Sequence, residues 1–151
     1  MNRSALRILV AVARQGEVSL GAAVQMGARR GRDHRDQYPL ALLLEGHYLG
    51  MTINYTPPSG AELMREYGLA ITLHMYLLPA DTTGAVQYLG VRRTGSLNTD
   101  KESVFLTAKG ALYLDEYRQK RRDRLLSVVL GFCTGLLIAV CAAWLKHRLN
   151  W

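Results

Sequence analysis

Chemically reactive side chains are few in this chain of 151 residues, and their spacing matches no catalytic or metal-binding motif. His34, His47 and His74 are scattered and lack the spacing that metal ligands share. Glu62 and Glu66 are four positions apart, where an exposed helix face explains them better than acid–base catalysis. The sequence has no phosphate-binding glycine loop, no His-Glu-x-x-His and no Gly-x-Ser-x-Gly. We therefore predict a protein without enzymatic activity, cofactor, catalytic residue or metal site.

Both cysteines, Cys133 and Cys141, lie in one apolar segment. Eight positions correspond to about 12 Å along a helix, which is too far for a disulfide within the chain. They are predicted to be apolar side chains rather than nucleophiles, with a disulfide between chains as the alternative.

Six arginines form the candidate contacts to nucleic acid or lipid. Four of them surround His34 and are interrupted by Asp33, and two lie together farther along the chain. The first group could bind phosphates, contact anionic headgroups, or pair with Asp33 and Asp36 in a solvated loop. The residues concerned are Arg29, Arg30, Arg32, Arg35, Arg92 and Arg93.

The net charge of +7 is concentrated near the carboxyl end of the chain. Residues 1–117 hold 12 Lys or Arg against 11 Asp or Glu, whereas residues 118–124 hold five against one. The distribution therefore argues against a general nucleic-acid-binding surface on the first part of the chain. The basic run is instead predicted to orient a membrane helix, and with Trp144 it comprises Arg118, Lys120, Arg121, Arg122 and Arg124.

Residues 125–145 carry no Asp, Glu, Lys, Arg, His, Asn or Gln. As a helix they would span about 31 Å, which matches the hydrocarbon core of a bilayer at about 30 Å. The basic run on the amino-terminal side favours a cytoplasmic location for that side, and Trp144 lies where an interfacial aromatic belt forms. We therefore predict a single-pass, tail-anchored protein with membrane lipid as a partner and a short tail at 146–151.

Small residues recur at a spacing of four within this predicted span, at Ser127, Gly131 and Gly135. This spacing allows two helices to approach closely, so a homodimer through the membrane helix is possible. Arginine outnumbers lysine throughout the chain, which suggests a bacterial or phage source and a bacterial inner membrane.

Residues 1–117 are long enough for one domain with its own core, called the head here. Helical periodicity predicts a helix over 4–14, with Ala5, Ile8, Leu9 and Val12 on its buried face. We expect a second helix over 17–30, a polar loop over 31–36, and a third helix with Pro39 in its first turn, capped by Asp36 or Gln37. A strand over 48–55 follows.

The second half of the head begins with a predicted helix that Ser59 and Glu62 would cap. Alternation of apolar and polar residues predicts a strand over 70–78, paired in a hairpin with a strand over 85–93. A short strand over 103–106 and a helix capped by Thr107 complete the head. No proline interrupts this last helix, so we expect it to continue through the basic helix 118–124 into the membrane.

Two stretches, "YPLALLLEGHYLGMTI" and "VFLTAKGALYL", resemble the third helix, wing and closing strand of the winged helix-turn-helix superfamily. The resemblance implies an α+β fold whose third helix enters the DNA major groove. That helix offers no Arg, Lys, Asn or Gln after Gln37, which departs from a DNA-reading helix. Gly-Ala…Glu-Tyr recurs at 60–67 and 110–117, so the domain closes either at the first copy or, with 55–100 inserted, at the second.

The sequence thus predicts a winged-helix-like head that binds a protein partner, joined by a long helix to a single membrane helix. The first alternative is a membrane-tethered regulator that binds nucleic acid. The second alternative is a small membrane-active effector whose apolar helices assemble in the bilayer.

Overall fold

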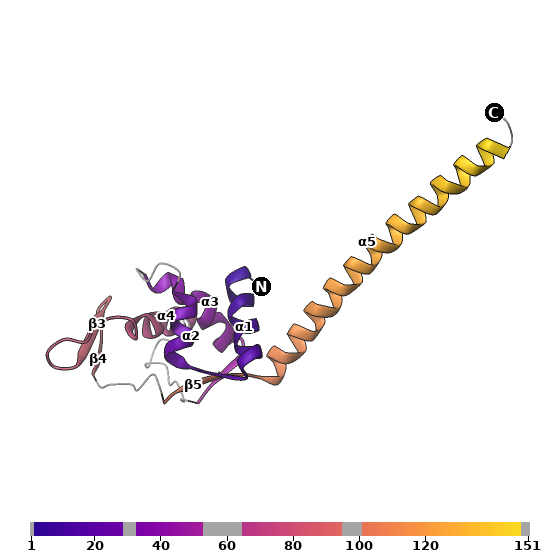
Figure 1. Cartoon of the computed structure of the whole chain (residues 1–151). Coiled ribbons are helices and arrows are strands. Elements are labelled where there is room, and N and C mark those ends of the chain that lie inside the picture. The colour runs from indigo at the N-terminus through magenta and orange to yellow at the C-terminus, as the bar shows by residue number, and fades with distance from the viewer. Residues whose placement is uncertain (1, 29–32, 53–64, 95–100, 149–151) are drawn as a thin grey trace. The chain divides into compact units, whose positions relative to one another are not determined.

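The computed structural model describes residues 2–28, 33–52, 65–94 and 101–148. The chain forms two units, Met1–Tyr113 and Leu114–Trp151, and the first, called the N-terminal unit here, is a mixed α+β fold. Figure 1 shows its elements. In chain order, with α5 extending into the second unit, they are α1 (Arg3–Gln15), β1 (Glu17–Ser19), α2 (Leu20–Gly27), the 3₁₀ helix η1 (His34–Gln37), α3 (Tyr38–Glu45), β2 (Leu49–Met51), α4 (Arg65–Met75), β3 (Ala85–Tyr88), β4 (Val91–Thr94), β5 (Ser103–Leu106) and α5 (Ala108–Arg148).

Helix α1 confirms the predicted helical periodicity. The Asn2 side chain caps it by accepting a hydrogen bond from the Ser4 N–H at 3.3 Å. The helix ends at Gly16, whose φ of +81° is accessible to glycine at little cost. The four predicted face residues, Ala5, Ile8, Leu9 and Val12, are all buried.

The second predicted helix, over 17–30, is wrong in its first turn. Glu17–Ser19 form strand β1, in which Val18 is buried, and the helix starts only at Leu20. Ser19 causes this change, because its hydroxyl accepts a hydrogen bond from the Ala22 N–H at 3.3 Å and caps α2.

The predicted polar loop over 31–36 is also wrong for its described residues. His34–Gln37 form η1, in which both His34 and Gln37 are buried. Gln37 precedes α3 but does not cap it with its side chain. Its amide instead donates a hydrogen bond to the Val24 carbonyl at 3.1 Å and fixes η1 to α2. Helix α3 itself confirms the prediction, with Pro39 in its first turn and an end at Gly46.

The predicted hairpin between 70–78 and 85–93 is wrong. Residues 65–75 form helix α4, in which every residue of Leu69–Met75 except Thr72 is buried. Burial on nearly all sides removes the amphipathic signal of a helix, and the chance alternation of Thr72 and His74 imitates a strand. The segment predicted as the second strand, 85–93, instead forms two strands, β3 and β4, which pair with each other as a hairpin. The predicted cap at Ser59 lies outside the described residues.

The sheet of the N-terminal unit is antiparallel with the order β1-β5-β2. Val104 lies at its centre, paired with both Val18 and Met51, and is fully buried. Since the central strand is the last one in the chain, the sheet closes at the second Gly-Ala…Glu-Tyr copy. The described residues between β2 and β5, which comprise α4 and the β3–β4 hairpin, therefore belong to a long connection between two paired strands.

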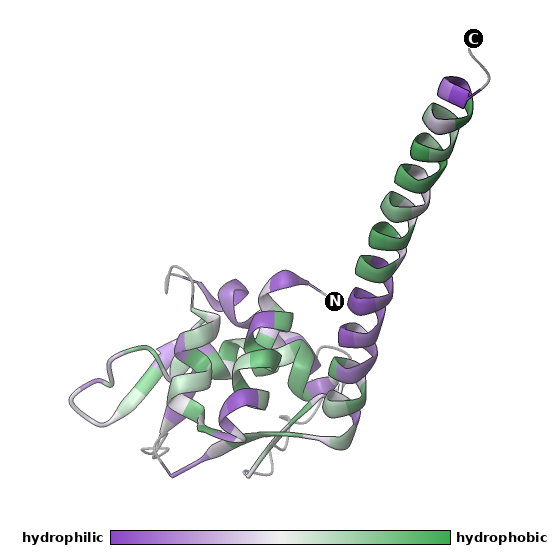
Figure 2. Ribbon diagram, turned by 45° about the vertical axis from the view of Figure 1, so that its right-hand side comes forward, coloured by the Kyte–Doolittle hydropathy of each residue, from purple (hydrophilic) through white to green (hydrophobic). Residues whose placement is uncertain are grey.

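Strand β5 leads directly into α5. The Thr107 hydroxyl accepts a hydrogen bond from the Gly110 N–H at 3.2 Å, which confirms the predicted cap, and donates one to the His47 carbonyl at 2.6 Å. Helix α5 continues without a break for 41 residues to Arg148. In the described part of the chain it is the one helix long and apolar enough to span a membrane. Figure 2 shows its polar turns followed by apolar ones.

Candidate functional site

Helix α3 is the element whose surface decides between a DNA reader and another kind of module. It packs against α1, α2 and α4. Leu42 is half exposed, at 50%, and is more exposed than any other side chain of α3. The residues buried in these contacts are Leu40, Ala41, Leu43 and Leu44.

Helix α4 comes from the connection between β2 and β5 and contacts α3 and η1 more extensively than any other element does. A recognition helix must present its side chains to base edges in a DNA groove. Four of the eight residues of α3 are instead buried in the core.

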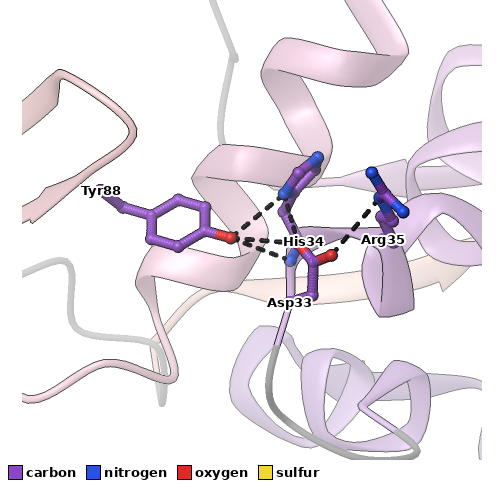
Figure 3. A network of polar contacts seen from close by, with 4 residues as sticks. All are labelled: Asp33, His34, Arg35 and Tyr88. Carbon is purple, nitrogen blue, oxygen red and sulfur yellow. Dashed lines mark hydrogen bonds and ion pairs between the residues drawn. The ribbon is translucent and has the colours of Figure 1, made fainter.

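A polar cluster fixes the hairpin to η1, and Figure 3 shows how its members face one another. Asp33 lies at the centre: its Oδ1 is 2.6 Å from His34 Nδ1 and accepts a hydrogen bond from the Tyr88 hydroxyl at 3.1 Å. Arg35 Nε lies 3.4 Å from the other carboxylate oxygen. Tyr88 is the last residue of β3, so its hydrogen bond to Asp33 joins residues more than fifty positions apart in the chain.

Aromatic rings enclose the imidazole of this cluster. Tyr38, Tyr67 and Tyr88 approach the His34 ring edge-on, with centroids 5.9, 5.3 and 5.9 Å away. The His74 ring from α4 lies 4.7 Å from that of Tyr88 and is 1% exposed, and none of the described residues supplies a hydrogen-bond partner for its Nδ1. His34 is 8% exposed, which leaves little room for a substrate beside it. These contacts hold the hairpin against η1, and the cluster is called the clamp here.

The charges of the cluster follow from these contacts. Partial burial raises the pKa of Asp33, but the hydrogen bond from Tyr88 and the charges of His34 and Arg35 outweigh it, so the net pKa is lowered. Burial, together with the Asp33 charge, raises the pKa of Tyr88. At neutral pH Asp33 is therefore an ionised acceptor and Tyr88 a neutral donor, the pair of states that the clamp needs.

The buried His74 is expected to make the N-terminal unit less stable in mild acid. Burial lowers its pKa below the ordinary 6.5, although the charge of Asp33 partly opposes this. Below about pH 6.5 the unfolded chain binds a proton at His74 that the folded chain does not bind. The stability is thus complete above that pH and falls as the pH decreases, which thermal unfolding of the full chain between pH 8 and pH 5 measures.

Two variants separate His74 from the other titrating groups. His74→Leu should flatten the acid loss of melting temperature. His47→Gln alters a histidine whose side chain is exposed and should keep the native pH profile. A His74→Leu profile as steep as the native one would contradict the prediction and assign the acid loss to other groups.

The predicted nucleic-acid contacts are distributed over separate elements, and Arg29, Arg30 and Arg32 lie outside the described residues. Arg35 is exposed on η1 and Arg92 is exposed on β4. The Arg93 guanidinium stacks on the Tyr76 ring, 4.2 Å from its centroid, which occupies it within the N-terminal unit. Among the described residues no contact joins Arg35 to the hairpin arginines, so the structure does not unite them into one surface.

The predicted membrane-orienting residues all lie on α5, where their side chains are exposed. Arg118 lies 3.6 Å from Asp115, Lys120 lies 3.8 Å from Glu116, and Arg148 stacks on Trp144. Of the small residues, Gly131 and Gly135 face open space. Three further predicted orienting residues, Arg121, Arg122 and Arg124, and the third small residue, Ser127, also lie on this helix.

The clamp cannot be predicted from the sequence, because its parts belong to four separate elements, η1, α3, α4 and β3. The sequence predicts a polar loop at Asp33 and His34 and a strand at His74. The one local signal is the density of tyrosine and histidine in residues 34–88, which becomes meaningful only once α4 is known to be a helix. Comparison with known proteins adds no relative, since no family model, no curated protein and no solved structure matches the chain.

Proposed function

We propose that the chain is a membrane-anchored adaptor: a non-enzymatic, winged-helix-like N-terminal unit that binds a protein partner and is held at the bilayer by α5. The order α1-β1-α2-α3-β2-β5 with an antiparallel β1-β5-β2 sheet supports the winged-helix assignment. In this assignment α3 corresponds to the recognition helix, and the β2–β5 connection, expanded by α4 and the hairpin, corresponds to the wing.

The burial of α3 carries the proposal. A DNA-reading helix needs exposed donors and acceptors, and α3 instead holds buried leucines beneath α4. The winged-helix framework is thereby separated from DNA readout, which favours a protein as the partner. A regulator that binds nucleic acid remains the second candidate; among the described residues it would use Arg35 and Arg92, which are exposed cations on different elements.

The membrane part of the proposal rests on α5. Its span over 125–145 is flanked by five cations on the amino-terminal side, and only Lys146 and Arg148 follow within the helix. This asymmetry favours a cytoplasmic N-terminal unit.

A binding experiment with the full chain in nanodiscs of zwitterionic lipid tests the proposal. Random duplex DNA is offered at about 50 mM and about 200 mM salt, since a phosphate-binding protein loses affinity steeply over this range. We expect no salt-dependent retention, and a stoichiometric protein that copurifies from native membranes. Micromolar DNA binding that fades with salt and is lost in an Arg35→Gln, Arg92→Gln chain would replace the adaptor with the nucleic-acid regulator.

A further inference from the structure

The tip of the β3–β4 hairpin has a backbone conformation that favours other residue types than the leucine found there. Leu89 and Gly90 connect the two strands, and both have positive φ, at +47° and +79°. A two-residue turn with two positive φ values favours Asn-Gly or Asp-Gly, because a side chain with a bulky Cβ substituent is crowded in this conformation. Glycine meets that need at position 90, but leucine at position 89 does not.

The apolar side chain of Leu89 is also exposed to solvent. Leu89 is 59% exposed, and Val91, on the other side of the turn, is 43% exposed. Figures 1 and 2 both show the hairpin at the outer edge of the N-terminal unit, beyond α4. Neither turn geometry nor packing within the described residues explains an exposed leucine here, whereas an external apolar contact would explain it.

Contacts at the base of the hairpin fix the position of its tip. Tyr88, next to Leu89, is held by Asp33 and the ring cluster (Figure 3). Arg93 stacks on Tyr76, and the Asp81 carboxylate accepts a hydrogen bond from the Ala85 N–H at 2.8 Å. A fixed base lowers the entropy lost when the tip binds.

The charge beside the tip has one sign. Residues 82–94 contain no Asp or Glu, and Arg92 projects from β4 as an exposed cation. The apolar tip is thus followed at once by positive charge, which is the order of groups that an anionic lipid surface accommodates.

We infer that the hairpin tip inserts Leu89 into the interface of an anionic bilayer, with Arg92 at the headgroups. Two exposed apolar residues are far too few for a stable protein interface, which buries about 800 Å² on each side. They also have no partner on a phosphate backbone, which disfavours nucleic acid. The inference rests on the proposed membrane anchor: α5 keeps the bilayer at a high effective concentration, so a contact that is weak by itself becomes populated.

The test uses the full chain with Cys133→Ala and Cys141→Ala, reconstituted at a large lipid excess. A single Gln87→Cys, exposed on β3 two positions before the tip, carries an environment-sensitive dye. In vesicles of phosphatidylcholine with phosphatidylglycerol, dye emission should shift to the blue and iodide quenching should fall by about twofold or more. In phosphatidylcholine alone both should remain as in water.

Leu89→Asn is the decisive variant. Asparagine tolerates positive φ and suits the turn, so the melting temperature should stay the same or rise, while the dye should return to its value in water. Leu112→Asn, at a comparably exposed leucine of α5, is the matched control and should keep the blue shift. A shift that persists in Leu89→Asn would overturn the role of the leucine.

The remaining outcomes separate this inference from the anchor. A chain that fails to stay with the vesicles would overturn the anchor itself. A chain that is anchored but whose dye stays fully quenched would overturn the hairpin contact alone. Equal shifts in both lipids would overturn the anionic requirement, and a shift that grows with the ratio of protein to lipid would assign the contact to a second protein.

Discussion

Gly110→Ala is expected to destabilise the N-terminal unit by about 3 kcal/mol, the upper end of the cost of overpacking. A Cβ at Gly110 would collide with the backbone carbonyl oxygen of Tyr48 and would come within 2.8 Å of Leu106 Cδ1. The Tyr48 backbone cannot turn aside, because the Tyr48 oxygen also accepts hydrogen bonds from Thr107. The melting temperature of the unit, followed by near-ultraviolet circular dichroism of its tyrosines, should fall by about 10 °C.

Gly131→Ala is the matched control for this prediction. It adds the same methyl group to the same helix, where nothing lies within 4 Å. It should leave the melting temperature unchanged. If the two alanine variants melt together, β5 and α5 do not approach the Tyr48 backbone as closely as described.

Leu137→Arg is expected to prevent stable integration of the chain into membranes. The residue lies in the middle of the apolar span, and an arginine at the centre of a membrane helix costs about 2.5–3.5 kcal/mol on the insertion scale. That cost lowers the ratio of inserted to non-inserted chain by about 100-fold. Alkaline carbonate extraction of membranes should therefore release most of the variant and little of the native chain.

Leu112→Arg provides the comparison for this variant. Leu112 is an equally apolar residue of α5 that lies before the basic run, outside the span. A charge there should leave carbonate resistance intact. Resistance of the Leu137→Arg chain that equals the native value would contradict a membrane location for α5.

The parts of the fold that were predictable are those in which one local signal acts alone. Helix α1 has a clear buried face, α3 has Pro39 and Gly46 at its ends, and α5 has the Thr107 cap and no interrupting proline. In each case the residues near one another in sequence also determine the element, so periodicity and capping are sufficient.

The parts that failed depend on tertiary context. Helix α4 lacks a polar face because α3, η1 and β3 surround it, so its pattern imitates a strand. The turn at Leu89 lacks the asparagine or aspartate that marks a hairpin, so the sequence predicts one strand where β3 and β4 form two. The clamp around His34 could not be predicted for the same reason, since Tyr88 and His74 lie on the two misassigned elements.

The position of β5 governs the order in which the N-terminal unit can fold during synthesis. Strands β1 and β2 flank β5, and the register pairs Val18 with Val104, across most of the unit. A nascent chain that ends before Ser103 can form its early helices, but it lacks the strand that joins the two edges of the sheet. Thr107 is the only residue between β5 and α5, so synthesis of α5 begins immediately after that of the strand that completes the sheet. With α5 as the proposed anchor, the central strand of the sheet and the anchor are therefore made in direct succession.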